Sequence, residues 1–343
     1  MKIGLVGYQG TGKSVAFELL TGNKPDLSKI QQGQSGVAVL PDSRFDGLVK
    51  MFSPKKQSPA KFELFDTPGL LREPGANNSQ RLSIMREAAA LVHVIGSYSG
   101  TDAIADARKL EEDMLLADLQ VVTNRLERLR ASIGKNRPDK EECQLELNCL
   151  VPIEAALNEG KMLREMPFTD DQEKYTKSFS FLSRKKQILL LNTADASVDT
   201  AVVSALEKAG YLVVSAPLGI ELELSALAPE EREVFAAEYG ITESSRERLL
   251  RAIFVVADLI TFFTSDEKEV HAWLLKRNST ALEAAHSIHS DLARGFIRAE
   301  IMAVDDLLRL GSEREVKAHN LYHIVGKEYI VKDGDEIIIR SGV

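Results

Sequence analysis

Short apolar runs alternate with amphipathic stretches over the first two thirds of the chain. Residues 2–6 are too uniformly apolar to alternate, which is typical of a buried parallel strand. Residues 14–21 are predicted to form a helix that ends near Gly22. Four more strands are predicted, at residues 61–65, 89–95, 188–191 and 211–214. Because helices and polar loops separate these strands, we predict an α/β fold with a mainly parallel sheet.

Between the predicted strands at 89–95 and 188–191, apolar residues recur at the spacing of a helix. Within residues 106–133, apolar side chains alternate at spacings of four and three, as in one half of a coiled-coil hairpin: Leu115, Leu119, Val122, Leu126, Leu129 and Ile133. Residues 141–160 are predicted to return, with a tip at residues 134–139, and Pro152 should kink or shorten the second helix. Because the two helices are adjacent in sequence, we favour packing within one chain over a dimerising zipper, and predict a monomer.

The remaining segments have other patterns. Residues 31–36 are polar and glycine-rich and are predicted to be a mobile loop. Near the C-terminus, strands are predicted at residues 270–276, 329–331 and 336–340, and a helix at 282–289. Trp273 lies in the first of these strands and is expected in the core.

Composition narrows the class of protein. A chain of 343 residues predicts two or three domains. No stretch approaches the ~20 apolar residues that span a bilayer, so we expect no membrane partner. The apolar run at residues 2–6 is too short for a signal peptide and leads directly into the glycine-rich residues 7–14. With only Cys143 and Cys149, a reduced, cytoplasmic protein is predicted. The net charge of −8 argues against autonomous nucleic-acid binding but leaves docking on a ribonucleoprotein open.

Residues 7–14 read Gly-Tyr-Gln-Gly-Thr-Gly-Lys-Ser, between a predicted strand and a predicted helix. This matches the phosphate-binding loop G-x-x-x-x-G-K-[ST], in which glycines let successive backbone N–H groups point at phosphates. Lys13 is predicted to reach the outer phosphates, and the Ser14 hydroxyl is predicted to bind Mg²⁺. The flanking elements favour this interpretation over a chance glycine-rich turn.

The tetrapeptide Asp66-Thr67-Pro68-Gly69 follows the second predicted strand. We predict that Asp66 belongs to the Mg²⁺ shell and that the Gly69 N–H contacts a terminal phosphate. Together with Lys13 these residues form the predicted catalytic set. Leu70 follows, where many GTPases place a water-orienting Gln, and an apolar side chain cannot polarise water. Any hydrolysis must therefore recruit another group.

The segment Asn192-Thr193-Ala194-Asp195 follows the fourth predicted strand, where a base-recognition loop belongs. A carboxylate at Asp195 can accept two hydrogen bonds from the guanine edge, a paired donor face that adenine lacks. Thr193 replaces the Lys that is usual in guanine-specific loops. The predicted nucleotide-binding residues are Gly7, Gln9, Gly10, Thr11, Gly12, Lys13, Ser14, Val15, Asn192, Asp195, Ser215 and Ala216.

With these motifs in place, the chain resembles the YchF/Obg-like ATPase family of translation-factor-related P-loop proteins. The resemblance covers nearly the full length and includes residues 39–46, 116–119 and 229–232. It is densest at the C-terminus, where residues 269–273, 295–300 and 326–335 are similar to a TGS domain, a ubiquitin-like β-grasp module.

The resemblance implies three parts: a G domain (residues 1–104 and 181–258), a helical coiled-coil insertion (105–180) and a TGS-like β-grasp domain (259–343). It also implies Mg²⁺-dependent binding of ATP or GTP, slow hydrolysis with Leu in the Gln position, and association with ribosomes. Many members prefer ATP, with Glu closing the motif Asn-x-x-Glu.

Several positions depart from the family pattern. Asp195 replaces the Glu, so the choice between ATP and GTP stays open. Gly10 stands where the family usually has Asn, and Ile30 aligns with the switch-loop Thr but cannot coordinate Mg²⁺. Ser28 and Ser35 lie nearby, and residues 72–78 replace the usual glycine-rich switch. Each departure weakens turnover more than nucleotide binding.

Two functions of different classes follow. The first is an NTPase switch, whose helical arm and β-grasp domain change how they contact a large partner, the ribosome or another ribonucleoprotein. The alternative is a scaffold that binds nucleotide and hardly hydrolyses it. Intact Lys13, Ser14 and Asp66 favour the switch. Acidic residues outnumber basic ones after residue 258, which favours a protein surface or a local RNA contact near Arg294 and Arg298.

Overall fold

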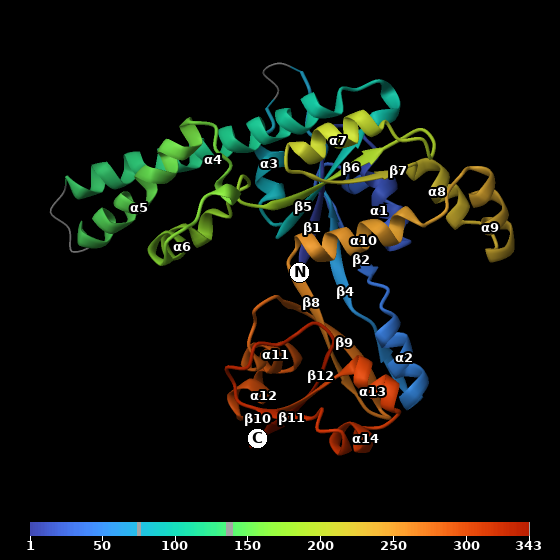
Figure 1. Ribbon diagram of the computed structural model, residues 1–343. Helices are drawn as coiled ribbons and strands as arrows, with labels where there is room; N and C mark the ends of the chain where they lie inside the picture. Colours follow the sequence, from blue (N-terminus) through green and yellow to red (C-terminus); the bar gives the residue numbers. More distant parts are fainter. Residues whose placement is uncertain (74–76, 135–139, 343) are drawn as a thin grey trace. The chain divides into compact units, whose positions relative to one another are not determined.

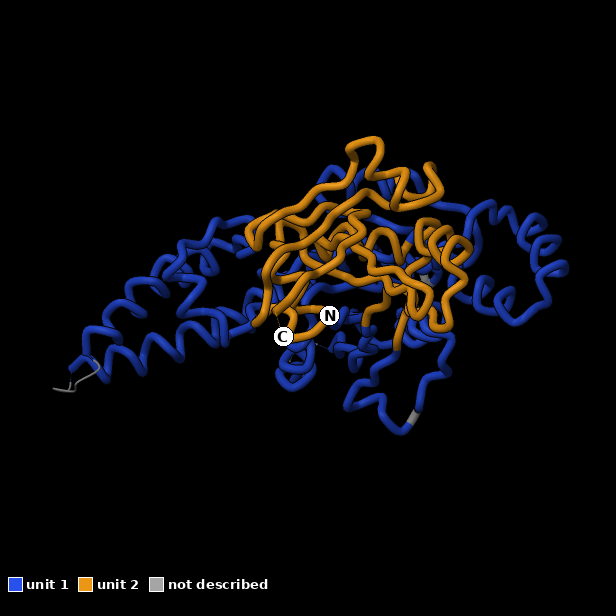
Figure 2. Tube along the Cα trace, turned by 90° about the horizontal axis from the view of Figure 1, so that it is seen from below, with its two compact units in different colours: residues 1–36, 63–248 blue, residues 37–62, 249–343 orange. Residues whose placement is uncertain are grey.

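The structure is a computed structural model that describes residues 1–73, 77–134 and 140–342. It contains two compact units, coloured separately in Figure 2: unit 1 comprises residues 1–36 and 63–248, and unit 2 comprises residues 37–62 and 249–343. Each unit is built from separate stretches of chain. In the described part, none of the helices combines the length and the apolar character needed to cross a membrane.

Unit 1 is organised around a six-stranded sheet with the order β2-β4-β1-β5-β6-β7. The pairs β1–β4, β1–β5, β5–β6 and β6–β7 are parallel. The strands are β1 (Lys2–Val6), β2 (Gln34–Val39), β4 (Lys61–Asp66), β5 (Ala90–Gly96), β6 (Lys186–Asn192) and β7 (Leu212–Ala216). All residues of β5 are buried, as its unbroken apolar run predicts. The predicted α/β fold is confirmed, and the loops after β1, β4, β6 and β7 meet at one edge of the sheet.

Helices alternate with these strands along the chain, as expected for an α/β unit (Figure 1). They are α1 (Lys13–Thr21), α3 (Ser79–Met85), α7 (Thr200–Lys208), α8 (Leu218–Ser225) and α9 (Pro229–Glu238). A further helix, α10 (Ser245–Val256), begins in unit 1 and continues into unit 2. α1 begins directly at the end of the loop that follows β1, so its N-terminus faces the loop edge of the sheet.

The helical insertion is a hairpin of α4 (Ala103–Ile133) and α5 (Lys140–Asn158), followed by α6 (Asp170–Thr176), and it extends to one side in Figure 1. The first half of α4 belongs to the sheet core, where Leu110 and Met114 pack with Val6 and Leu70. Its second half forms a separate core with α5, built from Val122, Leu126, Leu129, Leu150 and Ile153. Helix α4 therefore contributes to both cores, that of the sheet and that of the hairpin.

Pro152 does not end the second helix, which continues to Asn158, so the predicted early end is wrong. Ile153, Ala156 and Leu157 lie beyond the proline and are buried in the hairpin core. Their burial compensates for the backbone hydrogen bond that proline removes. Most of the predicted tip, residues 135–139, lies outside the described residues.

Unit 2 holds a second six-stranded sheet, with the order β11-β10-β12-β8-β9-β3. Its strands are β3 (Lys56–Ser58), β8 (Leu259–Ser265), β9 (Glu269–Lys276), β10 (Phe296–Ala303), β11 (His323–Val325) and β12 (Asp335–Ser341). Its helices are α2 (Ser43–Phe52), α11 (Ala281–Ile288), α12 (Ser290–Arg294), α13 (Val304–Leu310) and α14 (Glu313–Ala318). The predicted strand at 329–331 is wrong: only Ile330 makes an isolated bridge, to Thr280.

Candidate nucleotide-binding site

The loop between β1 and α1 is tightly curled. Gly7 and Gly12 have φ angles of 137° and 98°. A Cβ atom at Gly12 would lie 2.2 Å from the Asn192 amide nitrogen, and one at Gly7 would lie 2.5 Å from the Val94 carbonyl oxygen. Glycine is therefore required at both positions by close backbone approach as well as by φ. The curl ends at the N-terminus of α1, where free backbone N–H groups favour an anion.

Lys13 lies at the inner side of this loop. Its Nζ donates a 2.6 Å hydrogen bond to the Tyr8 carbonyl oxygen. Burial lowers the pKa of Lys13 to about 8, although the Asp66 carboxylate acts in the opposite direction. A Cβ at Gly69 would lie only 2.9 Å from Nζ, so the Gly69 backbone rests directly against the ammonium group. Lys13, Gly69 and the loop backbone thus meet, as the sequence motifs predict.

The segment after β4 docks on the loop through its backbone. Gln9 N–H donates to the Leu70 carbonyl at 2.9 Å, and Leu70 N–H donates to the Gly7 carbonyl at 3.0 Å. The Leu70 side chain is fully buried among Val6, Tyr8 and other apolar residues. Leu70 therefore serves the core and offers no group that could orient water.

Ser14 and Asp66 face each other, with Ser14 Oγ donating to Asp66 Oδ2 at 2.9 Å. The other carboxylate oxygen, Oδ1, is buried and has no hydrogen-bond partner among the described residues. Burial raises the pKa of Asp66, while hydrogen bonds from Ser14 and Gln34 and the Lys13 charge lower it. An unpartnered buried carboxylate oxygen beside a hydroxyl suits Mg²⁺, which prefers oxygen ligands. The residues present can therefore hold that ion.

Gln34 is a site residue that the sequence did not indicate. Its Nε2 donates to Asp66 Oδ2 at 3.3 Å, and its Oε1 accepts from Asp26 N–H at 2.7 Å. The prediction of a mobile loop over residues 31–36 is wrong for its last three residues, because Gln34 begins strand β2. A polar, glycine-rich stretch carries no local signal for this pairing, because the partner is 32 residues away.

The base-recognition segments come together beside the phosphate loop. Asn192 Nδ2 donates to the Thr11 carbonyl at 3.1 Å, and its Oδ1 accepts from Leu218 N–H at 3.3 Å. Thr193 N–H donates to the Ala216 carbonyl at 2.9 Å, which joins the loops after β6 and β7. The Asn192 side chain therefore links the phosphate loop, through Thr11, to the start of α8, through Leu218.

Beside these loops lies a polar cleft of about 200 Å³. Its lining includes Thr193, Ser215, Pro217 and Arg248. Asp195 is not one of its lining residues: its carboxylate accepts hydrogen bonds from the Ser197 N–H and hydroxyl, which lower the pKa of Asp195. The structure thus assembles three of the four predicted base-site residues and leaves the Asp195 carboxylate in a local turn.

The other predicted contacts occupy the loop itself. Gln9 and Gly10 are exposed, and Tyr98 donates its hydroxyl to the Gly10 carbonyl. Thr11 is buried with its hydroxyl on the Tyr8 carbonyl at 3.1 Å, and Val15 is half-buried in α1. Gln9, Gly10 and Thr11 precede α1, at the loop edge of the sheet.

Known proteins are similar in sequence to this chain. A family model described as "50S ribosome-binding GTPase" matches residues 2–125, and the YchF-GTPase_C model, described as "Protein of unknown function (DUF933)", matches residues 259–341. A protein named "Ribosome-binding ATPase YchF" from Bacillus subtilis is 33% identical, over 99% of both chains. The chain belongs to the YchF family. "Obg-like ATPase 1" from Oryza sativa subsp. japonica is 30% identical, over 100% of this chain and 92% of that protein.

A solved structure extends the family likeness to the fold. The Schizosaccharomyces pombe YchF GTPase has a TM-score of 0.83 over 99% of this chain and 97% of its own, at 23% identity. This structural similarity covers residues of both units. Together, the GTPase model and the relatives named as ATPases show that the chain is a P-loop NTPase of the YchF family.

Within this family member, the phosphate loop is bonded to α4 by side chains that sequence motifs did not indicate. The Tyr8 hydroxyl donates to Asp113 Oδ2 at 2.9 Å. Arg72 pairs with Asp106, with Nη2 2.7 Å from Oδ2, and its guanidinium lies 4.5 Å from the centre of the Tyr8 ring. The loop, the segment after Leu70 and the first half of α4 therefore form one polar network.

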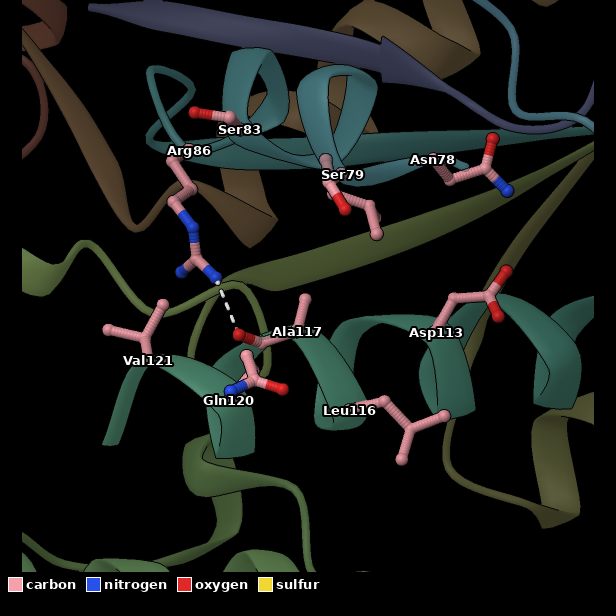
Figure 3. Close-up of a pocket in the computed structure, with 10 residues that line it drawn as sticks. Asn78, Ser79, Ser83, Arg86, Asp113, Leu116, Ala117, Gln120 and Val121 are labelled. Carbon is pink, nitrogen blue, oxygen red and sulfur yellow. Dashed lines mark hydrogen bonds between the residues drawn. The ribbon is translucent and has the colours of Figure 1, made fainter. Parts of the chain in front are cut away.

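Asp113 also lines a groove of about 460 Å³ between α3 and α4 (Figure 3). Ser79 and Ser83 of α3 lie on one side, and Leu116 and Gln120 of α4 lie on the other. Arg86 closes one end by donating to the Ala117 carbonyl at 3.2 Å. Asp113 therefore belongs both to the polar network and to the lining of this groove.

Proposed function

We propose that this protein binds a Mg²⁺–nucleoside triphosphate at residues 7–14 and 66–69 and hydrolyses it slowly. The observation that carries the proposal is the convergence of Ser14, Asp66, Lys13 and Gly69 on one point of the loop edge. Two segments more than 50 residues apart in the chain supply these groups, which a chance glycine-rich turn would not bring together.

Each residue has a distinct proposed role. Loop N–H groups and the start of α1 hold the phosphates, and Lys13 leaves the Tyr8 carbonyl to neutralise their outer charge. Ser14 and Asp66 hold Mg²⁺, which neutralises charge that develops on the phosphate oxygens. The Gly69 N–H donates to the terminal phosphate. With Leu70 buried, no side chain at that position assists the attacking water, so turnover is slow.

The base pocket of the proposal is formed by Asn192, Thr193, Ser215 and Ala216. Asp195 must leave Ser197 to read the base edge, so the base choice between ATP and GTP depends on that rearrangement. If the Asp195 carboxylate turns toward the base, it favours guanine. If it stays hydrogen-bonded to Ser197, the backbone of the loops selects between ATP and GTP.

The switch part of the proposal rests on the network at α4. Triphosphate must displace Lys13 from Tyr8, and Tyr8 and Arg72 are bonded to Asp113 and Asp106 of α4. A change in the loop is therefore transmitted to the helix that continues into the hairpin. The relatives named as ribosome-binding ATPases supply the proposed partner. We propose that the hairpin and a TGS-like unit 2 contact the ribosome in the cytoplasm.

A turnover measurement separates the switch from the scaffold alternative. Phosphate release from ATP and from GTP would be followed with and without purified ribosomes, using Lys13→Ala as the inactive control. The proposal expects slow release that ribosomes accelerate severalfold and that Lys13→Ala abolishes. Bound nucleotide without release under either condition would instead support a non-hydrolysing scaffold.

A further inference from the structure

Ser28, Gln34 and Ser35 are three candidates within residues 26–36 to supply an oxygen at the metal-binding corner formed by Ser14 and Asp66. The two serines are engaged elsewhere. Ser28 Oγ donates to Asp26 Oδ1 at 2.7 Å, and Ser35 donates its hydroxyl to Glu63. Ile30 has no oxygen and is largely exposed. Gln34 is the one polar side chain of residues 26–36 for which a contact with Asp66 is observed among the described residues.

The approach of this segment to Asp66 is close. Gly33 has a φ of 80°, and a Cβ there would lie 2.6 Å from Phe65 Cζ and 3.1 Å from the Asp66 carbonyl oxygen. Glycine at 33 therefore permits Gln34 to sit at this corner. Ser14 Oγ and Gln34 Nε2 donate to the same oxygen, Asp66 Oδ2. Ser14 and Gln34, from two other chain segments, thus both contact the Asp66 carboxylate, whose Oδ1 has no partner among the described residues.

The amide oxygen of Gln34 holds the segment in place. Oε1 accepts from Asp26 N–H at 2.7 Å, at the start of η1 (Leu27–Lys29). If the side-chain amide turns over, its oxygen faces the corner and the Asp26 N–H loses its acceptor. A single rotation would then exchange a contact within the segment for a contact at the metal.

We propose that Gln34 is a metal-binding residue for the Mg²⁺–nucleoside triphosphate. Its amide oxygen enters the Mg²⁺ shell, a place that Ser28 and Ser35 do not take because their hydroxyls are bonded elsewhere. Amide carbonyl oxygens are suitable hard ligands for this ion. Release of Asp26 N–H then couples occupancy of the site to the conformation of residues 26–33. The inference rests on the proposed function.

The test is the Mg²⁺ concentration at which a fluorescent triphosphate analogue is half-bound by the full-length protein. Gln34→Ala removes the oxygen, and we expect the Mg²⁺ midpoint to rise about tenfold, the lower end of effects seen when groups around a metal are removed. Gln34→Glu keeps an oxygen but loses the donor to Asp66, and should stay within about twofold of wild type. Gln32→Ala, an exposed glutamine two residues away, is the matched control.

A second readout reports on the segment. Amide hydrogen exchange of residues 26–33 should increase on addition of Mg²⁺–triphosphate in wild type and in Gln32→Ala, and should be raised already without ligand in Gln34→Ala. An unchanged midpoint in Gln34→Ala would overturn the proposal. So would a Gln34→Glu midpoint as high as that of Gln34→Ala, because the donor to Asp66 would then be the important group. Failure of wild type to bind any nucleotide, in contrast, would overturn the proposed function itself.

Discussion

The hydroxyl of Tyr8 donates a 2.9 Å hydrogen bond to Asp113, and the two residues are 105 positions apart in the chain. Tyr8 belongs to the phosphate loop, and its carbonyl oxygen also accepts from Lys13. Asp113 belongs to α4, the helix shared by the sheet core and the hairpin core. One residue of the loop is thus bonded both to the predicted phosphate-binding ammonium and to the helical arm.

Tyr8→Phe should separate nucleotide binding from the response of the arm. The ring stays in the core, so nucleotide affinity should change by less than about threefold, while loss of one hydrogen bond costs about 1 kcal/mol of stability. Co-sedimentation with ribosomes should lose its dependence on triphosphate. Retention of that dependence at wild-type strength would show that the Tyr8–Asp113 bond does not transmit the change.

Arg72 and Asp106 offer a second test of the same network. The Asp106 carboxylate is 7% exposed, whereas Arg72 is 44% exposed, so Arg72→Met should cost about 1 to 2 kcal/mol by leaving a buried carboxylate unpaired. A double-mutant cycle with Asp106→Asn in urea unfolding should give a coupling energy of about 1 kcal/mol.

The hairpin holds a matched pair, Arg125 and Glu146, with exposures of 41% and 10%. Arg125→Met should reduce stability by a similar amount, yet keep the effect of triphosphate on ribosome co-sedimentation. Equal loss of that effect in Arg72→Met and Arg125→Met would point to general destabilisation and would contradict a specific role for Arg72.

Asn192 and Asp195 should behave differently on substitution, although both belong to one predicted motif. Asn192→Ala removes the hydrogen bonds to Thr11 and Leu218, so we expect a stability loss of about 1 to 3 kcal/mol and weaker binding of ATP and GTP alike. Asp195 is exposed, so Asp195→Ala should leave stability nearly unchanged and alter the ratio of ATP to GTP affinity. Parallel titrations of both variants with both nucleotides would show this split. An unchanged ratio in Asp195→Ala would remove Asp195 from base selection.

Unit 2 contains a buried carboxyl group, that of Glu336, which should make the stability of the fold depend on pH. Burial raises the pKa of Glu336 from 4.5 to about 7, against the hydrogen bonds from Ser265. The folded protein keeps this proton between pH 4.5 and 7, where the unfolded chain has lost it, so stability falls as pH rises through this window. The free energy of unfolding should fall by about 3 kcal/mol in total across this window, since each unit of pKa difference contributes about 1.4 kcal/mol.

Glu336→Gln should remove this contribution. Urea unfolding of the whole chain can be followed by the fluorescence of Trp273, the single tryptophan, which lies in β9 of unit 2. The variant should be within about 1 kcal/mol of wild type at pH 5 and more stable at pH 8, by up to about 3 kcal/mol. The exposed Glu328→Gln serves as control. Identical pH profiles of Glu336→Gln and wild type would contradict the buried, protonated state.

The fold and the phosphate loop could be predicted because their signals are local. The apolar run of β5 and the spacing from Gly7 to Ser14 each lie within a few residues, and the five predicted strands of unit 1 are present. Gln34, Tyr8 and Arg72 could not be assigned, because their contacts are with Asp66, Asp113 and Asp106, which lie 32 or more residues away. The second helix of the hairpin was predicted, but its continuation past Pro152 was not, because tertiary burial of Ile153 outweighs a local helix breaker.

The central claim, that residues 7–14 and 66–69 bind Mg²⁺–triphosphate, is tested most directly by equilibrium titration. Wild type and Lys13→Ala would each be titrated with fluorescent ATP and GTP analogues, with and without Mg²⁺. We predict saturable, Mg²⁺-dependent binding of at least one nucleotide by wild type, and affinity at least tenfold lower in Lys13→Ala. Equal binding by the two proteins, or no binding by either, would contradict the claim.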